Sequence, residues 1–305
     1  MEIHMEEYKF TKRVHNILKI AAEEAESNII QPAHLFIGMC KEGTGVCSEL
    51  YMYLFRKVGI EFSEKLSIRK QYDSPYQEYE KIGQYKVSYK VLEILQIAKK
   101  RMERFQQVIM NEGHVIYALF HVDTFIGNVQ IKKDILRIIA EPRDLAVDLK
   151  CFVPTYNHLI CTVRKASPSD FEKLASFVKE EFGERWLHSI EYGFRTYKDN
   201  LSIYIAEQEE VIVGFACYDV VRGKKGLFGP MGTAKKNRVN GVGKQLLYRC
   251  LHSMKKEGYE YAIIGQAGPV EFYERCCNAR LIPVESNNQL QMGVGFFMKI
   301  TRFAL

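Results

Sequence analysis

The stretch NRVNGVGKQLL, from Asn237 to Leu247, places two glycines just before an apolar helical pattern. It follows GLFGPMGT (226–233), which is predicted to be a strand, and it opens a predicted helix with Leu246 and Leu247 on its apolar face. In a strand–loop–helix unit, backbone N–H groups converge at the helix N-terminus and attract an anion. Glycines at 241 and 243 let a pyrophosphate approach the main chain without interference from Cβ atoms. The stretch therefore predicts an anion-binding loop.

Two familiar phosphate loops do not fit these residues. The dinucleotide pattern Gly-x-Gly-x-x-Gly fails because Leu246 stands where the third glycine belongs. The nucleotide-triphosphate loop fails because Gln245, rather than Ser or Thr, follows Lys244. Neither Walker motif occurs in the chain, so no ATPase activity is expected.

Composition sets the class of protein. A chain of 305 residues with 47% hydrophobic and 26% charged residues is typical of a folded two-domain protein. A net charge of +6 suits an anionic small molecule and is too small for a dedicated nucleic-acid binder. No apolar run is long enough for a membrane span, and the N-terminus does not resemble a secretory signal. The eight cysteines form no C-x-x-C pair, so we expect no metal site and a reduced, cytoplasmic chain.

Residues 1–145 have a helical pattern that is repeated. Thr11 is a predicted N-cap, and the apolar face that follows recurs 77 residues later: Val14, Ile17, Leu18 and Ala21 match Val91, Ile94, Leu95 and Ala98. PAHLFIGM, with His34, is echoed by EGHVIYAL, with His114, at an offset of 80. Such a duplication predicts an all-helical domain of two similar units, with residues 70–84 as a connecting loop. Both histidines are expected to be structural.

These repeats resemble the N-terminal domain of Clp-family unfoldases over residues 8–140. The resemblance implies a domain that docks adaptors and substrates, with a protein partner bound through residues 8–140; a structural scaffold and a dimer contact are left open as alternative roles. In the Clp domains that bind phosphoarginine, a Glu commonly precedes the motif histidine. Ala33 and Gly113 stand there in this chain, which argues against that ligand.

The pattern changes around residues 141–158, and we expect a linker at 146–159 followed by a second domain at 160–305. A strand (159–166), a helix (167–183) and a hairpin around Glu209 and Glu210 come first. A strand, the glycine loop with its helix, another strand and the helix PVEFYERCCNAR follow. This order predicts an α/β or α+β sheet domain.

The loop and the last helix together point to a family. The pattern R-x-x-G-x-G is formed by Arg238, Gly241 and Gly243, and FYE follows at 272–274. This combination, spanning about residues 160–285, resembles the GNAT superfamily of acetyl-CoA-dependent N-acetyltransferases. The resemblance implies a mixed, splayed sheet with acetyl-CoA held in the split.

The resemblance also implies roles for individual residues. Tyr273 matches the tyrosine that protonates the departing thiolate. The residues implied to bind acetyl-CoA are Met231, Gly232, Thr233, Arg238, Val239, Asn240, Gly241, Val242, Gly243, Lys244 and Gln266. The general base is left open between Glu184, His188, Asp219 and water.

From these features we expect a two-domain enzyme that moves acetyl from acetyl-CoA directly onto an amine. The rival hypothesis is a Clp-like adaptor whose second domain holds acyl-CoA as a sensor without turnover. The amine acceptor, the oligomeric state and the role of the tail 286–305 are left open.

Overall fold

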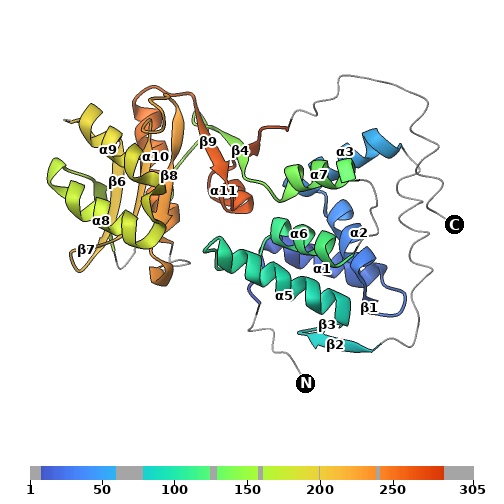
Figure 1. The fold of residues 1–305 in the computed structure, drawn as a ribbon. Coiled ribbons are helices and arrows are strands. Elements are labelled where there is room, and N and C mark those ends of the chain that lie inside the picture. The colour runs from blue at the N-terminus through green and yellow to red at the C-terminus, as the bar shows by residue number, and fades with distance from the viewer. Residues whose placement is uncertain are drawn as a thin grey trace.

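The computed structural model describes residues 8–59, 78–123, 129–156, 161–198, 200–237 and 241–284. A helical half and a sheet-containing half lie side by side in Figure 1, and α11 and β4 lie between them. Within these ranges, no helix combines the length and apolarity needed to cross a membrane.

The helical half contains two units of the same design. The first comprises α1 (Lys12–Glu24), α2 (Pro32–Glu42) and α3 (Gly45–Val58), and the second comprises α5 (Tyr89–Arg104), α6 (Glu112–Val122) and α7 (Val129–Ile139). Thr11 caps α1 by accepting the Val14 N–H, and Ser88 caps α5 by accepting the Val91 N–H. The two caps are 77 residues apart in sequence, which confirms the duplication.

The two motif histidines are structural, as expected. His34 is completely buried, and its Nδ1 accepts the Gln31 N–H at 3.1 Å. His114 repeats this arrangement with the Asn111 N–H, also at 3.1 Å. Each ring therefore satisfies a backbone donor at the start of its helix, which is the role of a capping box.

A small sheet joins the two helical units, and here the sequence prediction was partly wrong. β2 (Tyr79–Ile82) and β3 (Tyr85–Ser88) form an antiparallel hairpin, and β1 (Ile29–Ile30) pairs with β3 in parallel. Residues 79–82 had been expected to lie in a loop. Only Ile82 of β2 is buried, so the strand lacks the alternation by which it could have been recognised.

The second half is built on a mixed seven-stranded sheet in the order β10-β4-β9-β8-β7-β6-β5. Its strands are β4 (Arg143–Asp148), β5 (Thr162–Lys165), β6 (Ile203–Gln208), β7 (Val211–Tyr218), β8 (Leu227–Thr233), β9 (Tyr261–Ala267) and β10 (Arg280–Leu281). β8 and β9 are parallel, and the other neighbours are antiparallel. The mixed sheet agrees with the prediction, and so does the hairpin turn at Glu209 and Glu210, both of which have positive φ.

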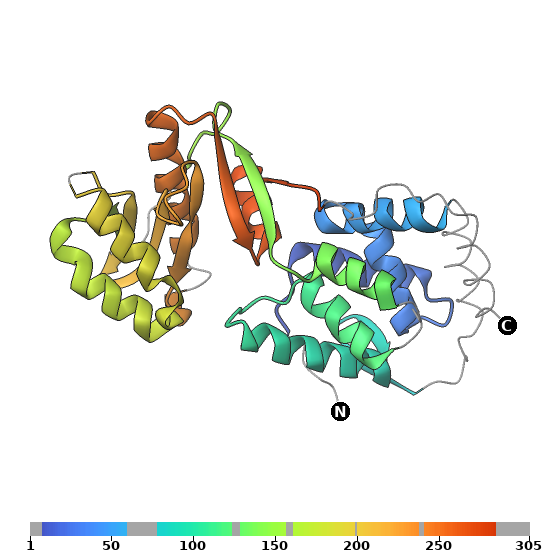
Figure 2. The ribbon, with the colours of Figure 1, turned by 45° about the horizontal axis from the view of Figure 1, so that its top comes forward.

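The position of β4 corrects the expected linker. A linker was expected at residues 146–159, but residues 146–148 belong to β4, which lies between β9 and β10 inside the sheet (Figure 2, where green β4 runs beside orange-red β9). Leu145, Val147 and Leu149 are fully buried. The chain therefore enters the second half through an interior strand rather than through an exposed tether.

Helices cover both faces of this sheet. One face carries η3 (Pro168–Asp170), α8 (Phe171–Phe182), η4 (Glu184–Trp186) and α9 (Leu187–Thr196). The opposite face carries α10 (Val242–Lys256) and α11 (Val270–Cys277), and η5 (Lys235–Asn237) lies between β8 and α10 in the chain. Successive side chains of β7 point to opposite faces of the sheet. Phe215 packs in the buried cluster under α8 and α9, and Ala216 packs in the buried cluster under α10 and α11.

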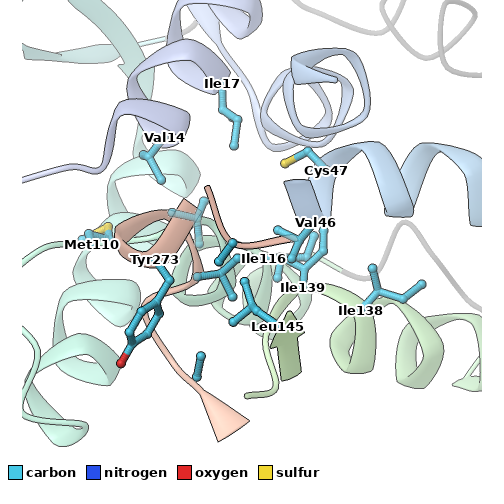
Figure 3. Close-up of a cluster of buried hydrophobic side chains, with 14 of the residues drawn as sticks. Val14, Ile17, Val46, Cys47, Met110, Ile116, Ile138, Ile139, Leu145 and Tyr273 are labelled. Atoms are coloured by element: carbon cyan, nitrogen blue, oxygen red, sulfur yellow. The ribbon is translucent and has the colours of Figure 1, made fainter. Parts of the chain in front are cut away.

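The core on the α11 side continues into the helical half. Tyr273 of α11 and Leu145 of β4 belong to the same buried cluster as Val14, Ile116 and Ile139 of the helical half (Figure 3). Burial of apolar surface across this boundary stabilises the contact between the halves.

Candidate active site

A fork between β8 and β9 is the centre of the candidate site. The two strands pair only at Leu227 with Ile263 and at Phe228 with Ile264. Beyond this point β8 stays paired with β7, as far as Thr233 with Gly214. The sheet is therefore splayed, as the resemblance implied.

β9, the second strand of the fork, is paired with β4 along its whole length. The N–H of Gln266 donates to Asp144 Oδ1 at 2.7 Å, and the register between β9 and β4 shifts at the same place, between Arg143 and Leu145. Gln266 has a φ of 52°, and its side-chain Nε2 is 3.4 Å from the same Asp144 oxygen. Gln266 therefore lies on β9 and is exposed. Its main-chain N–H and its side-chain amide are both directed to Asp144. Its predicted contact with the cofactor stays a prediction.

β8, the other strand of the fork, presents backbone groups to the opening between β8 and β9. Ala234 donates its N–H to Val213 on β7 at 2.9 Å, and N–H directions alternate along an extended strand. By this alternation, the N–H of Met231 points away from β7 and towards the fork. Met231 is also opposite Ala216 in the register. The predicted strand-end residues therefore border the opening.

Gly232 and Gly243 differ in the space that surrounds them. A Cβ at Gly232 would overlap the ring of Phe182, which packs on that face of β8. A Cβ at Gly243 would have ordinary contacts of 3.8 Å with Thr233, 3.9 Å with Phe272 and 4.0 Å with Met231. The start of α10, the end of β8 and α11 thus meet at Gly243.

The N-terminus of α10 is formed by the glycine loop. Gly241 is the N-cap with a φ of 80°, a left-handed conformation that favours glycine. Val242 is buried, and the Lys244 ammonium lies 5.3 Å from the Tyr248 ring centroid. The other predicted loop residues, Arg238, Val239 and Asn240, lie outside the described residues.

Tyr273 stands at the vertex of the fork. Its ring centroid is 6.3 Å from that of Phe228, the last β8 residue to pair with β9. The side chain is buried, and burial raises the pKa of the phenol well above its usual range. Among the described residues, no group forms a hydrogen bond with the hydroxyl. The phenol is therefore protonated at neutral pH.

The cysteines that follow Tyr273 are packing residues. Cys277 Sγ lies 3.2 Å from the carbonyl oxygen of Tyr273, and burial raises the pKa of its thiol to about 12. Burial also raises the pKa of Cys276. Neither thiol has the lowered pKa of a nucleophile, and all eight cysteines of the chain are free.

The candidate bases fall into two groups. Asp219 is buried beside the start of β8, at the same end as the vertex of the fork: its N–H donates to the Leu227 carbonyl at 2.9 Å, and its carboxylate accepts the Tyr259 hydroxyl and the Gly226 N–H, each at 2.7 Å. Its role as a base stays a prediction. Glu184 and His188 are exposed on either side of Trp186. Trp186 packs on Phe182, whose ring covers Gly232, so this segment lies on the face of β8 opposite α11.

Asp144 is a site residue that the sequence reasoning missed. Its segment was interpreted as the end of the helical domain and a linker. The signal was present in the sequence, because two sets of residues alternate in the pattern of a half-buried strand. One set is Arg143, Leu145, Val147 and Leu149, and the other is Asp144, Ala146 and Asp148.

Among the described residues, no cluster of His, Cys, Asp or Glu has the arrangement of a metal site.

Comparison with family models identifies both halves. The acetyltransferase (GNAT) family model matches residues 171–278, and the Clp repeat (R) N-terminal domain model matches residues 9–131. The chain therefore joins a Clp repeat N-terminal domain to a domain of the GNAT acetyltransferase family. No curated protein sequence matches the chain.

Several solved structures are similar to less than half of this chain. A GCN5-related N-acetyltransferase from Sphaerobacter thermophilus is 20% identical, with a TM-score of 0.38 over 47% of this chain and 49% of its own. An aminoglycoside N-acetyltransferase in complex with CoA is 17% identical, with a TM-score of 0.33 over 46% of this chain and 99% of its own. The N-terminal domain of the caseinolytic protease associated chaperone ClpD from Arabidopsis thaliana is 16% identical, with a TM-score of 0.31 over 43% of this chain and 91% of its own. The chain covers between 20% and 49% of the length of the first three structures it matches.

Proposed function

We propose that the protein transfers the acetyl group of acetyl-CoA directly onto an amine in the fork between β8 and β9. The observation that supports this best is the position of Tyr273 at the vertex of the fork, beside Phe228. Phe272, the neighbour of Tyr273 on α11, lies where the start of α10 at Gly243 meets the side chain of Met231. These are the groups that thioester chemistry requires: a proton donor, a backbone N–H and an anion site.

Acetyl-CoA would be held mainly by main-chain groups. The start of α10, with Gly241 as its N-cap, would bind the pyrophosphate through N–H groups and the positive end of the helix dipole. Gly243 adds no side chain between that helix start and β8. Acetyl-CoA supplies the acetyl thioester, and the protein supplies its orientation.

The residues of the chain would then act on the developing charges. As the amine nitrogen attacks the carbonyl carbon, an oxyanion forms that the Met231 N–H would stabilise. The C–S bond breaks, and Tyr273 would donate its proton to the leaving thiolate. The amine loses its proton to water or to a base on the Glu184–His188 segment, whose side of β8 lies opposite α11.

An acceptor screen tests this proposal. Full-length protein is incubated with acetyl-CoA and a panel of amines, and release of free CoA thiol is measured. At least one acceptor should give release well above hydrolysis in buffer, together with the acetylated product. Tight binding of acetyl-CoA without release for any small amine, peptide or protein would instead support the acyl-CoA sensor hypothesis.

We also propose that the Clp repeat domain, residues 9–131, docks a protein that carries the acceptor. The family match supports this role for the helical half. The test compares kcat/KM for a protein acceptor with that for a small amine of the same side-chain chemistry. The protein should be preferred through a lower KM, and equal values would contradict docking.

A further inference from the structure

The helix that carries Tyr273 is anchored on its opposite face. α11 has eight residues, and an isolated helix of this length is unstable in water. At 3.6 residues per turn, Glu271 and Glu274 share one face, and Phe272 and Tyr273 lie on the other. Contacts made by the two carboxylates therefore influence where the phenol stands.

Glu271 binds the N-terminus of α1. Its Oε1 accepts the N–H of Lys12 at 3.1 Å, and its Oε2 accepts the N–H of Arg13 at 3.0 Å. Thr11 accepts the next donor, the Val14 N–H. One carboxylate from the acetyltransferase domain thus completes the cap of a helix in the other half, and the positive end of the α1 dipole favours its charge.

Glu274 binds the side chain of Arg13. Arg13 Nη2 is 2.7 Å from Glu274 Oε2, and Nη1 is 2.9 Å from Glu112 Oε1 on α6. Only 4% of Arg13 is exposed. A Cβ at Gly45 would overlap both the Arg13 guanidinium and the Glu274 carboxylate, so glycine at this position makes room for the pair. Charge-assisted hydrogen bonds to a buried guanidinium impose a defined geometry.

We propose that Glu271 and Glu274 are positioning residues, which hold α11 against α1 so that Tyr273 stands at the vertex of the fork. This inference rests on the proposed function, in which Tyr273 is the proton donor. It makes the Clp repeat domain part of the catalytic unit, since α1 supplies the groups to which α11 is bound.

The test is the double substitution Glu271→Gln with Glu274→Gln in full-length protein. Glutamine keeps the size and one acceptor oxygen, and Arg13 keeps Glu112 as an ionic partner, so the fold should persist. We expect kcat to fall roughly tenfold while KM for acetyl-CoA changes less than about twofold. In a Tyr273→Phe background, the same double substitution should change kcat less than about twofold, because the two sites act through one group.

The control is Glu260→Gln, which removes an exposed carboxylate paired with Lys150 at 2.9 Å near β9. It should leave kcat unchanged. An equal loss of kcat in the parent and Tyr273→Phe backgrounds would show a merely structural role and would overturn the proposal, as would an undiminished kcat in the double variant.

A second measurement does not depend on turnover. Hydrogen exchange of the α11 amides, residues 270–277, should be faster in the double variant than in the parent, whereas Glu260→Gln should leave it unchanged. Unchanged protection in the double variant would overturn the anchoring. If the parent releases no thiol with any acceptor, the proposed function fails, and the exchange measurement still decides whether the two carboxylates hold α11.

Discussion

Arg13 of α1 and Glu274 of α11 form an ion pair of 2.7 Å although 261 positions separate them in sequence. The pair joins the beginning of the Clp repeat domain to the helix of the acetyltransferase domain that carries Tyr273. Glu112 and Glu42 also lie within 4 Å of the guanidinium, at 2.9 and 3.6 Å. Because Glu112 and Arg13 are buried, loss of the guanidinium would leave a buried charge without compensation.

Replacing Tyr273 with Phe should lower turnover and leave the binding of acetyl-CoA nearly unchanged. Loss of a positioned acid typically costs roughly 10²–10⁴-fold in rate. The thermal midpoint should change little, since no described residue bonds to the hydroxyl. Steady-state thiol release and calorimetric binding of acetyl-CoA measure the two effects.

A suitable control is Tyr204→Phe, on β6, whose hydroxyl lies 2.6 Å from Ser253 Oγ. This substitution removes a hydroxyl from the same domain but not from the fork, and turnover should persist. Parent-like rates for Tyr273→Phe would remove Tyr273 from the mechanism.

Two glycine substitutions should separate packing from ligand binding. Gly232→Ala introduces a Cβ that overlaps Phe182 and should destabilise the protein by about 1–3 kcal/mol, a usual cost of overpacking. Gly243→Ala meets only ordinary contacts, and alanine favours a helix over glycine, so stability without ligand should be equal or higher. Acetyl-CoA affinity should nevertheless fall in Gly243→Ala, because a methyl group would stand on the proposed path of the pyrophosphate.

Urea unfolding and acetyl-CoA titration of both variants check this contrast. Undiminished affinity in Gly243→Ala would place the ligand elsewhere.

Two truncated chains should differ sharply in folding. Residues 142–305 keep β4, whereas residues 155–305 lose it, and both lack the helical domain. Removing β4 deletes the fully buried side chains of Leu145, Val147 and Leu149. At about 1.5–3 kcal/mol for each large apolar side chain, this loss is comparable with the total stability of a domain.

The shorter chain should therefore aggregate or show no cooperative melting, whereas the longer chain should show it. Circular dichroism and analytical gel filtration distinguish them. A folded, monomeric 155–305 chain would mean that β4 is dispensable.

Stability should decrease on mild acidification because of His114. Burial lowers the pKa of His114 from 6.5 to about 4, and the Arg101 guanidinium contributes to the decrease. Between these two values the unfolded chain binds a proton that the folded chain does not. The His114 contribution is therefore complete above pH 6.5 and is lost as the pH falls towards 4, by about 3 kcal/mol at most.

Unfolding midpoints at pH 7.5 and pH 5 test this, with His114→Gln as the comparison. The variant lacks the titrating ring that accepts the Asn111 N–H, so it should be less stable at pH 7.5 and should lose less on acidification. The same pH dependence in both proteins would refute the assignment.

Local patterns predicted most elements correctly. The helical repeat follows from apolar residues at helical spacing, since Val14 and Val91 are both buried in the first turn of their helices. The strand–loop–helix around Gly241 and the FYE helix followed from turn chemistry and periodicity in the same way. β2 was missed because a mostly exposed strand with one buried residue carries almost no periodic signal.

β4 was missed for a different reason. Its alternation is clear, but it follows a helical domain and precedes an irregular stretch, where a linker is the simpler interpretation. Only pairing with β9, more than a hundred residues further along the chain, makes it a strand of the second domain. The hydrogen bonds that Gln266 donates to Asp144 were therefore not predicted either.

The sequence by itself determined which local structures form and which family motifs they carry, because periodicity, caps and glycine positions act over a few residues. The tertiary structure decided that Tyr273 stands beside Phe228 at the vertex of the fork and that its helix is bound to α1 by Arg13, Glu271 and Glu274. These contacts join segments more than forty and more than two hundred and fifty residues apart in the chain. Their energies depend on burial and on distances of about 3 Å, which are set only when both halves have folded against each other.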